Sequence, residues 1–460
     1  MSDQQNMLHP GRLGPGRLAR LPLTQRFATR FAHALLGRLE EGELTLETQA
    51  GRRVFGEPAR DGLCAQVRLR DDAVLAVVAM RGALGAAETY IAGLWECDDL
   101  TALVRILVRN QAALEAMDHR WSFALKPLRL ALDRLRPRGR GAARRDIHAH
   151  YDLGNEFFAL FLDPSMTYSC AIFDRPGMTL EEASIAKIDR ACAKLDLRPG
   201  DHLLEIGTGW GSMAIHAARE YGCRVTTTTI SKRQAAFAHQ RIEEEGLGDR
   251  ITVLERDFRD LEGVYDKLVS IEMIEAVGAP LLGTYVRKCG ELLKPDGAML
   301  LQSITIDDRH YERAKSRVDF LKKYIFPGSF LPSVSAISTA LARESDLRVG
   351  HLEDIGLHYA ATLRQWRENF GARLDEARAL GLDEPFIRMW MWYFCYCEGT
   401  FAERRASDVQ MLLLKPRCGL EWPLRAHSGQ AAPAGPDTEG GAHAASAVTR
   451  SHRDAPALSS

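Results

Sequence analysis

The sequence feature that most constrains the fold is a glycine-rich loop that joins an apolar strand to a helix. The segment LLEIGTGWG runs from Leu203 to Gly211, and a helical pattern follows from Met213 to Glu220. An acid, Glu205, stands just before the first glycine. Glycines let the backbone approach a ligand closely at the carboxyl edge of a sheet, where open α/β sheets bind their ligands. The segment therefore predicts a strand, a ligand-binding turn and a helix within an α/β fold.

Apolar runs and amphipathic stretches alternate through residues 146–425, which predicts a doubly wound α/β fold with a mostly parallel sheet. The runs expected to form strands are Leu203–Ile206, Val225–Ile230, Ile251–Leu254, Lys267–Ile274 and Ala298–Ile306. Glu275 directly follows the fourth run, at the end of a strand where such folds place their chemistry. Residues 146–425 are therefore predicted to form the catalytic domain.

The residues before this domain show a different pattern. Residues 1–20 contain Gly, Pro and Arg without the apolar region of a signal peptide, and we expect a mobile arm. Residues 21–118 predict a small N-terminal α+β domain. Its expected elements are a helix with Leu23, Phe27, Phe31 and Leu35 on one face and Gly37 at its end, strands at Gly42–Thr48 and Leu63–Met80, and a second helix that Asp98 or Asp99 caps.

Composition and charge exclude several classes of protein. The 460 residues are 46% hydrophobic and 26% charged, as in a folded soluble protein. Lys plus Arg (60) nearly equals Asp plus Glu (61), so global charge gives no argument for a nucleic-acid partner. The nine cysteines are scattered and show no zinc spacing, which favours reduced thiols in a cytoplasm and no metal site. The best candidate for a membrane span, Ile325–Ala342, contains two prolines and four serines, so no spanning helix is predicted.

Two further segments differ from the predicted domains in charge and complexity. Residues 119–145 form a basic linker, and positions 120–145 hold nine Lys or Arg against one acid. This segment is either a solvated linker or a basic face that meets anionic lipid headgroups. It lacks the interleaved aromatic residues that accompany nucleic-acid binding. Residues 426–460 contain no aromatic residue, Ile or Met, so we expect a disordered tail.

The spacing of the loop glycines narrows the class of ligand. Dinucleotide-binding loops follow GxGxxG, whereas Ser212 occupies the sixth position here and the pattern is GxGxG. This spacing resembles that of class I S-adenosylmethionine (SAM) methyltransferases, which have a Rossmann-like fold; packing alone also produces glycine-rich turns. The next strand, CRVTTTTI, ends without the acid that usually binds the ribose hydroxyls of SAM.

Several motifs in the same order resemble the cyclopropane fatty acid synthases and the related mycolic acid cyclopropane synthases. They are TISKRQ (Thr229–Gln234), HYDLGNEFFALFLDPSMTYSCAIF (His150–Phe173), SIEMIEAVG (Ser270–Gly278) and RMWMWYFCYCEGTFAERRASDVQMLLLKP (Arg388–Pro416). The resemblance extends from about residue 21 to 417. The N-terminal unit also resembles the extra domain that longer bacterial members place before the catalytic domain.

The resemblance implies transfer of a methylene group from SAM to the cis double bond of an acyl chain, usually in a membrane phospholipid. It implies a carbocation on the chain and a bound bicarbonate that removes a proton from the new methyl group. The implied bicarbonate cradle consists of Cys170, Glu275, Gln302, Ile304 and Tyr359. Gln302 departs from the family, where many members have His. A neutral Gln donates a hydrogen bond but does not shuttle a proton. The run Leu301–Ser333 looks closer to a plant-type branch in which Gln occurs.

The same matching implies residues that contact SAM or the acyl chain. The SAM contacts are Tyr168, Ser169, Gly207, Gly209, Gly211, Thr229, Ser231, Gln234, Asp257 and Phe258, and Tyr151 is expected over the SAM or the acyl chain. The aromatic run Met389–Cys397 either lines an acyl tunnel or is a buried helix. Phe326, Phe330 and Leu331, preceded by Lys322 and Lys323, form either a membrane-touching edge or a loop packed on the core.

The first functional hypothesis is a cyclopropane-fatty-acyl-phospholipid synthase that is cytoplasmic and peripheral at the inner face of the membrane, with a homodimer left open. A second is a SAM-dependent C-methyltransferase that gives methylene- or methyl-branched acyl chains. Plant alkaloid N-methyltransferases also resemble the family, but the N-terminal unit and the basic linker argue against that activity. A hypothesis of another class is a non-catalytic lipid-binding protein, which the glycine loop together with Glu275 and Tyr359 opposes.

Overall fold

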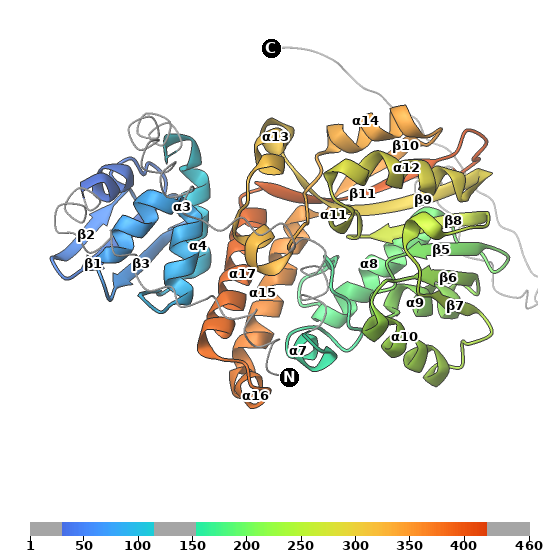
Figure 1. Cartoon of the computed structure of the whole chain (residues 1–460), viewed down its shortest axis with the longest axis horizontal. Coiled ribbons are helices and arrows are strands. Elements are labelled where there is room, and N and C mark those ends of the chain that lie inside the picture. Colours follow the sequence, from blue (N-terminus) through green and yellow to red (C-terminus); the bar gives the residue numbers. More distant parts are fainter. Residues whose placement is uncertain (1–29, 115–152, 421–460) are drawn as a thin grey trace, which may run out of the picture. The chain divides into compact units, whose positions relative to one another are not determined.

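The structure is a computed structural model of the chain, and it describes residues 30–114 and 153–420. Several predictions lie outside these residues. They are the N-terminal arm, the basic linker, the C-terminal tail and the position of Tyr151. The described residues form two β-sheets (Figure 1), each of which is covered by helices.

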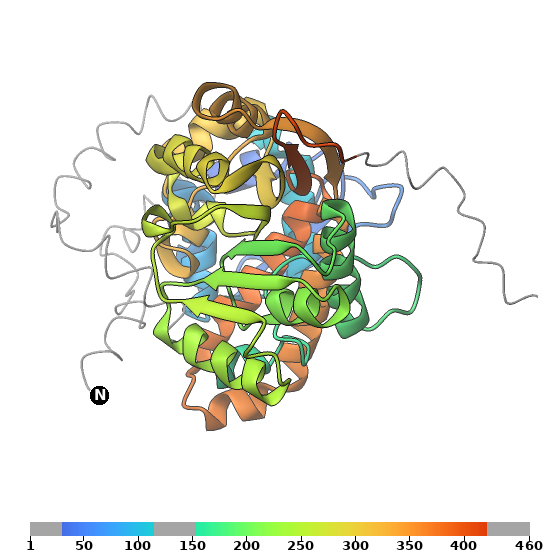
Figure 2. The same ribbon diagram turned by 90° about the vertical axis from the view of Figure 1, so that its right-hand side faces the viewer.

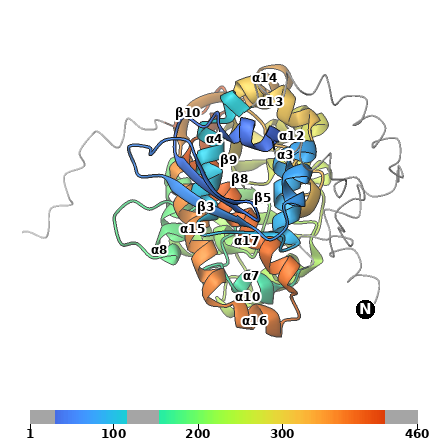
Figure 3. The ribbon, with the colours of Figure 1, turned by 90° about the vertical axis from the view of Figure 1, so that its left-hand side faces the viewer.

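The N-terminal sheet has four strands in the order β2-β1-β3-β4, and Figure 3 turns it toward the reader. The strands are β1 (Glu43–Thr48), β2 (Gly51–Phe55), β3 (Cys64–Leu69) and β4 (Trp95–Cys97). Asp99 caps helix α4 (Leu100–Arg109), because its side chain accepts a hydrogen bond from the backbone N–H of Ala102 at 2.8 Å. The predicted strand at Gly42–Thr48 and the aspartate cap are confirmed, whereas β2 and β4 were not foreseen.

The prediction of one strand across Leu63–Met80 is wrong. The strand β3 ends at Leu69, and helix α3 (Ala73–Ile91) begins after a turn in which the backbone N–H of Ala73 donates to Asp71 Oδ1 at 2.8 Å. The run of Ala, Val and Leu after this turn has no strand alternation, and Ala favours a helix.

Helix α3 is long and apolar enough to cross a membrane by length and composition alone, which the sequence analysis did not foresee. Within the structure 44% of that apolar window is buried. Gly82 interrupts the helix with φ 57° and ψ −140°. A kinked and partly buried helix of this kind is also what the core of a globular domain contains, so α3 is weak support for a membrane span.

The catalytic sheet has seven strands in the order β10-β11-β9-β8-β5-β6-β7. The strands are β5 (His202–Ile206), β6 (Arg224–Thr228), β7 (Ile251–Leu254), β8 (Tyr265–Ile271), β9 (Leu293–Ile306), β10 (Arg348–Asp354) and β11 (Ala406–Leu414). The first five are parallel to one another, and β11 is antiparallel to both β9 and β10. The five predicted strands are all present. Two end earlier than expected: β6 at Thr228, and β8 at Ile271, where the backbone turns at Glu272.

Helices cover both faces of this sheet (Figures 1 and 2). The helices described in residues 153–420 are α7 (Asn155–Ala159), α8 (Leu180–Leu195), α9 (Ser212–Glu220), α10 (Lys232–Glu244), α11 (Ile274–Val277), α12 (Leu282–Glu291), α13 (Asp308–Ser316), α14 (Val334–Glu344), α15 (Gly356–Ala372), α16 (Leu374–Ala379) and α17 (Glu384–Ala402). Helix α8 contacts α9, and α12 packs against α14. The sheet order and the two helix layers are those of a Rossmann-like fold.

Burial bears on two alternatives that the sequence left open. The run Met389–Cys397 lies in α17, which packs beside α15, and Trp390 and Phe394 are fully buried. The run therefore lies in a buried helix, and its role in lining an acyl tunnel stays a prediction. Phe330 is also buried, and its backbone N–H donates to the carbonyl of Glu275 at 3.0 Å. At Phe330 that loop packs on the core of the catalytic domain, and the membrane-touching edge stays a prediction.

Candidate active site

The three glycines of the loop adopt left-handed backbone conformations, but their surroundings differ. The φ values are 108° at Gly207, 52° at Gly209 and 91° at Gly211. A Cβ added at Gly207 would lie 3.1 Å from Met273 Cγ, and one at Gly211 would lie 3.4 Å from Ala238 Cβ. One at Gly209 would meet no atom of the protein within 4 Å. Gly207 and Gly211 therefore serve close packing, and Gly209 leaves its flank open for a ligand.

The second predicted SAM motif lies beside this loop. The backbone N–H groups of Gly207 and Thr208 both donate to the carbonyl of Thr228 at 3.0 Å. Ser231 caps α10, and the Thr229 hydroxyl donates to Gln234 Oε1 at 3.1 Å. The polar groups of TISKRQ thus follow β6 at the same carboxyl edge of the sheet as the glycine loop, which is where SAM is expected.

The other predicted SAM contacts already have partners within the protein. Asp257 forms an ion pair with Arg259 at 2.8 Å, which lowers the pKa of its carboxyl. Phe258 packs on Tyr285 with ring centroids 5.2 Å apart. The Tyr168 and Tyr393 hydroxyls lie 3.1 Å apart. The roles of Asp257, Phe258 and Tyr168 in SAM binding stay predictions.

Three residues of the predicted bicarbonate cradle converge on one carboxylate, that of Glu272. The backbone N–H of Cys170 donates to Glu272 Oε1 at 2.7 Å, and Gln302 Nε2 donates to the same atom at 2.8 Å. The Tyr359 hydroxyl donates to Glu272 Oε2 at 2.6 Å. These donors come from the loop before α8, from β9 and from α15, while Glu272 stands directly after β8.

The other two cradle residues meet each other instead. Glu275 Oε1 accepts hydrogen bonds from the Ser303 hydroxyl at 2.9 Å and from the backbone N–H of Ile304 at 2.6 Å. Glu275 Oε2 is buried without a hydrogen-bond partner among the residues that the structure describes. Burial, and then the charge of Glu272, raise the pKa of Glu275 to about 8.

Gln302 is held in place by strand β11. Its Nε2 also donates to Asp408 Oδ2 at 2.9 Å, and its Oε1 accepts from Gln410 Nε2 at 3.0 Å. Lys194 donates to Gln410 Oε1 at 2.7 Å and supports this chain of bonds. Burial, followed by the charge of Glu272, raises the pKa of Asp408 well above its usual range. The amide of Gln302 therefore has two acceptors and one donor in fixed positions.

A buried lysine compensates the charge at this centre. Lys187 on α8 is 1% exposed, and its ammonium donates to the Ser169 hydroxyl at 2.8 Å. Burial lowers the pKa of Lys187, and the charge of Glu272 is the largest influence in the opposite direction. The hydroxyl of Ser169, a predicted SAM contact, therefore already accepts a hydrogen bond from Lys187.

Sequence reasoning missed Glu272, Asp408 and Lys187. Glu272 had a usable signal, because SIEMIEAVG places two acids three residues apart directly after a buried strand. Asp408 and Lys187 have no such local signal. They become recognisable only as buried charges that the fold brings to one place.

The bicarbonate implied by the family resemblance does not fit these donors as the structure arranges them. Cys170, Gln302 and Tyr359 already donate to Glu272, and Ile304 already donates to Glu275. A bicarbonate ion at this place would need the same hydrogen bonds. It would also set a second negative charge beside Glu272, which is unfavourable in a partly buried site.

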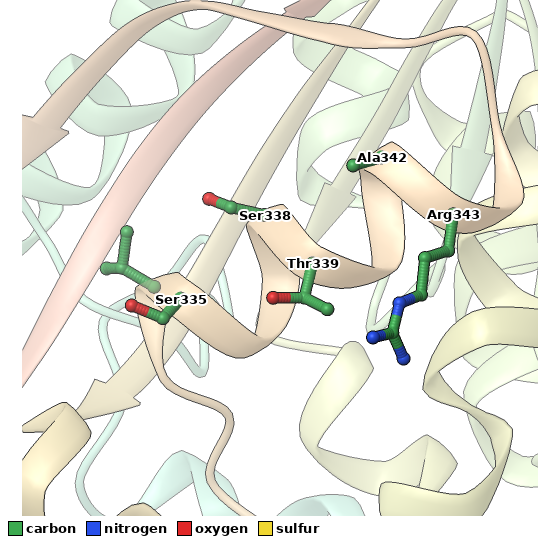
Figure 4. Close-up of a pocket in the computed structure, with 6 residues that line it drawn as sticks. Ser335, Ser338, Thr339, Ala342 and Arg343 are labelled. Carbon is green, nitrogen blue, oxygen red and sulfur yellow. The ribbon is translucent and has the colours of Figure 1, made fainter.

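The pocket on α14 is separate from this centre. A surface hollow of about 430 Å³ lies on α14, lined by Val334, Ser335, Ser338, Thr339, Ala342 and Arg343 (Figure 4). None of its lining residues belongs to the centre around Glu272. Within residues 30–114 and 153–420, no group of three or more His, Cys, Asp or Glu side chains is arranged to hold a metal ion.

Comparison with known proteins gives the family. The family described as mycolic acid cyclopropane synthetase matches residues 139–411. Tuberculostearic acid methyltransferase UfaA1 of Mycobacterium tuberculosis is 37% identical over 354 residues, which are 75% of this chain and 82% of that protein. Cyclopropane-fatty-acyl-phospholipid synthase of Escherichia coli K12 is 36% identical over 363 residues, 78% of this chain and 90% of that protein. The chain belongs to the cyclopropane synthase family.

A solved structure agrees with this assignment. Mycolic acid cyclopropane synthase CmaA1, complexed with SAH and CTAB, is 34% identical with a TM-score of 0.55, and the match covers 59% of this chain and 98% of that one. The predicted family and the predicted class I methyltransferase fold are confirmed. The protein is a SAM-dependent methyltransferase of the cyclopropane synthase type.

Proposed function

We propose that this cyclopropane synthase family member transfers a methylene group from SAM to the cis double bond of an unsaturated acyl chain in a membrane phospholipid, forming a cyclopropane. The observation that carries the proposal is a partly exposed carboxylate, Glu272, held by three donors at the same sheet edge as an open glycine loop. SAM supplies an electrophilic methyl group when bound. The protein must then orient the acyl chain, exclude water and remove one proton from the transferred methyl group.

The surroundings of Glu272 suit a carbocation on the acyl chain. Tyr359 stacks on Phe401 with ring centroids 4.5 Å apart, and its edge meets Trp366 at 6.0 Å. Trp366 also lies 5.1 Å from Tyr168, which packs on Phe158 at 5.3 Å. Aromatic faces attract a cation and exclude the water that would quench it. This aromatic wall therefore supports chemistry through a cationic intermediate.

The phospholipid substrate is supported by the match to Escherichia coli cyclopropane-fatty-acyl-phospholipid synthase over 90% of that protein. A cytoplasmic location at the inner face of the membrane, with the basic segment at 120–145 touching anionic headgroups, belongs to the same proposal. Whether the protein forms a homodimer is left open in this proposal.

A branched-chain product is the second candidate. The relative with 37% identity is named tuberculostearic acid methyltransferase, and the Pseudomonas putida relative, 39% identical, is named a probable fatty acid methyltransferase. Ring closure and methylene formation share every step until the proton is removed. A non-catalytic lipid-binding role is disfavoured, because the hydrogen-bonded carboxylate of Glu272 and the open flank at Gly209 are both present.

The experiment combines the purified chain, SAM and vesicles of phosphatidylethanolamine with cis-monounsaturated chains. We expect SAH formation and an equal amount of modified acyl chain. Mass alone does not separate a ring from an isomeric methylene branch, so NMR of the fatty esters identifies the product. SAH without lipid modification, or no SAH at all, contradicts the proposal, and a branched product establishes the second candidate.

A further inference from the structure

We propose that Glu272 is the catalytic base of this enzyme, and that its carboxylate takes the place of a bound bicarbonate. The inference rests on the proposed function, in which a proton must leave the transferred methyl group. Its basis is the geometry around Glu272. Three of the groups that the family resemblance assigns to a bicarbonate cradle donate to this side chain, at 2.7, 2.8 and 2.6 Å.

Glu272 differs from its neighbouring carboxyl groups in accessibility. Glu275 is 9% exposed and Asp408 is 0% exposed, so both carboxyl groups are buried. Glu272 has intermediate exposure. Of these three acids, Glu272 alone is both held by donors from several elements and partly exposed, as suits a base that meets a substrate.

The backbone at Glu272 supports a functional role. Its φ of 48° lies in the left-handed region, where a non-glycine residue is uncommon. Such a conformation is energetically unfavourable and persists where the surrounding structure fixes it. At Glu272 the backbone N–H also donates to the carbonyl of Gln302 at 2.9 Å. Strand β9 therefore holds both the backbone and the side chain of this residue.

The electrostatics of the centre accommodate one negative charge. Burial, followed by the charge of Glu272, raises the pKa of the Asp408 carboxyl well above its usual range, which disfavours a second negative charge beside Glu272. The ammonium of Lys187 is fully buried nearby and favours an anion at Glu272. A second anion would meet repulsion from Glu272 and would lack free donors. The chain thus carries its own anion where a small dissolved anion would otherwise be bound.

The proposed step balances as follows. The π electrons of the alkene form a C–C bond to the methyl carbon, the C–S electron pair stays on sulfur as SAH forms, and a cation remains on the neighbouring chain carbon. The Glu272 carboxylate then takes a proton from the transferred methyl group, and the released C–H electron pair closes the ring. The neutral Glu272 later returns the proton to solvent. The net products are SAH, the cyclopropane and one proton.

Two substitutions separate this role from bicarbonate catalysis. Glu272→Gly suits the left-handed backbone and opens the three donors to an external anion. Glu272→Gln removes the base but still fills the same space. Glu344→Gln, at the half-buried C-terminal end of α14 where Glu344 pairs with Arg287 and far from the groups around Glu272 in the hydrogen-bond network, is the control.

The turnover experiment compares these variants with and without carbon dioxide. The parent enzyme should lose no turnover when carbon dioxide is rigorously removed. Both Glu272 variants should lose about 10²–10⁴-fold. Added bicarbonate should restore Glu272→Gly in part and leave Glu272→Gln inactive, because the glutamine blocks the anion. A parent that needs bicarbonate, or a Glu272→Gly variant with parental turnover in its absence, overturns the proposal.

An anion-binding measurement needs no lipid substrate and keeps the two proposals distinguishable. Calorimetric titration with sodium bicarbonate should show saturable binding to Glu272→Gly and none to the parent, to Glu272→Gln or to Glu344→Gln. Saturable binding to the parent, or no binding to Glu272→Gly, overturns the assignment of Glu272 to the anion position. If no lipid is modified by the parent, the phospholipid function fails, and this titration still decides the place of Glu272.

Discussion

The Tyr359 hydroxyl donates to Glu272 Oε2 across 2.6 Å and so ties helix α15 to the end of strand β8. Tyr359 is 5% exposed and stacks on Phe401, which leaves its ring little freedom to turn. The hydrogen bond therefore fixes the direction in which the Glu272 carboxylate faces. Tyr359 also presents an aromatic ring at the same place, so one side chain serves both the base and the cationic intermediate.

Replacement of Tyr359 by Phe tests the hydrogen bond without removing the ring. The variant keeps the aromatic face but leaves Glu272 Oε2 without the tyrosine donor. We expect kcat to fall by about tenfold or more, in line with a lost charge-assisted hydrogen bond of roughly 1.5–3 kcal/mol. The dissociation constant of SAM, measured by calorimetry, should stay unchanged. A kcat equal to that of the parent would show that the carboxylate does not depend on Tyr359.

Replacement of Gly209 tests the ligand side of the glycine loop. Gly209→Val places a branched side chain on the flank where no protein atom lies within 4 Å, and so in the space predicted for SAM. Calorimetry should show that SAM binding is lost while the fold is kept. Gly246→Val is the matched control, because Gly246 has φ 66° and equally open surroundings just after α10. Equal SAM affinity in the two variants would contradict the assignment of the loop.

Local sequence patterns were sufficient for most strands and insufficient for the catalytic centre. The strands β5 to β9 are apolar runs bounded by polar turns, so their positions follow from neighbouring residues alone. Leu63–Met80 failed because its apolar run carries no period that separates a strand from a buried helix. The role of Glu272 depends on hydrogen bonds from Cys170, Gln302 and Tyr359, which lie between 30 and 102 residues away in the sequence. The family resemblance named these donors, but only the three-dimensional structure shows which group they hold.

Gln302→Leu tests the support from strand β11. Leucine has a similar size but provides neither donor nor acceptor, so Asp408 Oδ2 and Gln410 Nε2 lose their partner. An unsatisfied buried polar group costs about 1–3 kcal/mol, and we expect the free energy of unfolding in urea to fall by that order. Turnover should also fall, since Glu272 loses one donor. Unchanged stability would mean that water or neighbouring groups satisfy both partners.

The basic linker is tested by vesicle binding. If residues 120–145 meet anionic headgroups, binding should strengthen with anionic lipid and weaken with salt, because exposed charges are screened over about 8–10 Å at physiological ionic strength. Replacing Arg136, Arg138, Arg140, Arg144 and Arg145 with Ser should weaken sedimentation with anionic vesicles. Equal binding by parent and variant would leave the segment a solvated linker.

The raised pKa of Glu275 predicts how stability changes with pH. The folded protein keeps the Glu275 proton up to about pH 8, whereas the unfolded chain releases it near 4.5. Between these values the folded state binds more protons than the unfolded state, so this carboxyl makes stability fall as pH rises, by up to roughly 1.4 kcal/mol per pH unit. Glu275→Gln removes this contribution but keeps an acceptor for Ile304. The variant should therefore gain stability relative to the parent as pH rises from about 5 to 8, in urea unfolding at fixed ionic strength.

Burial also raises the pKa of Glu205 to about 8, but this carboxyl contributes the same dependence of stability on pH in the parent and in the variant. A difference between parent and variant that does not change with pH would mean that Glu275 is ionised in the folded enzyme, with a second negative charge beside Glu272.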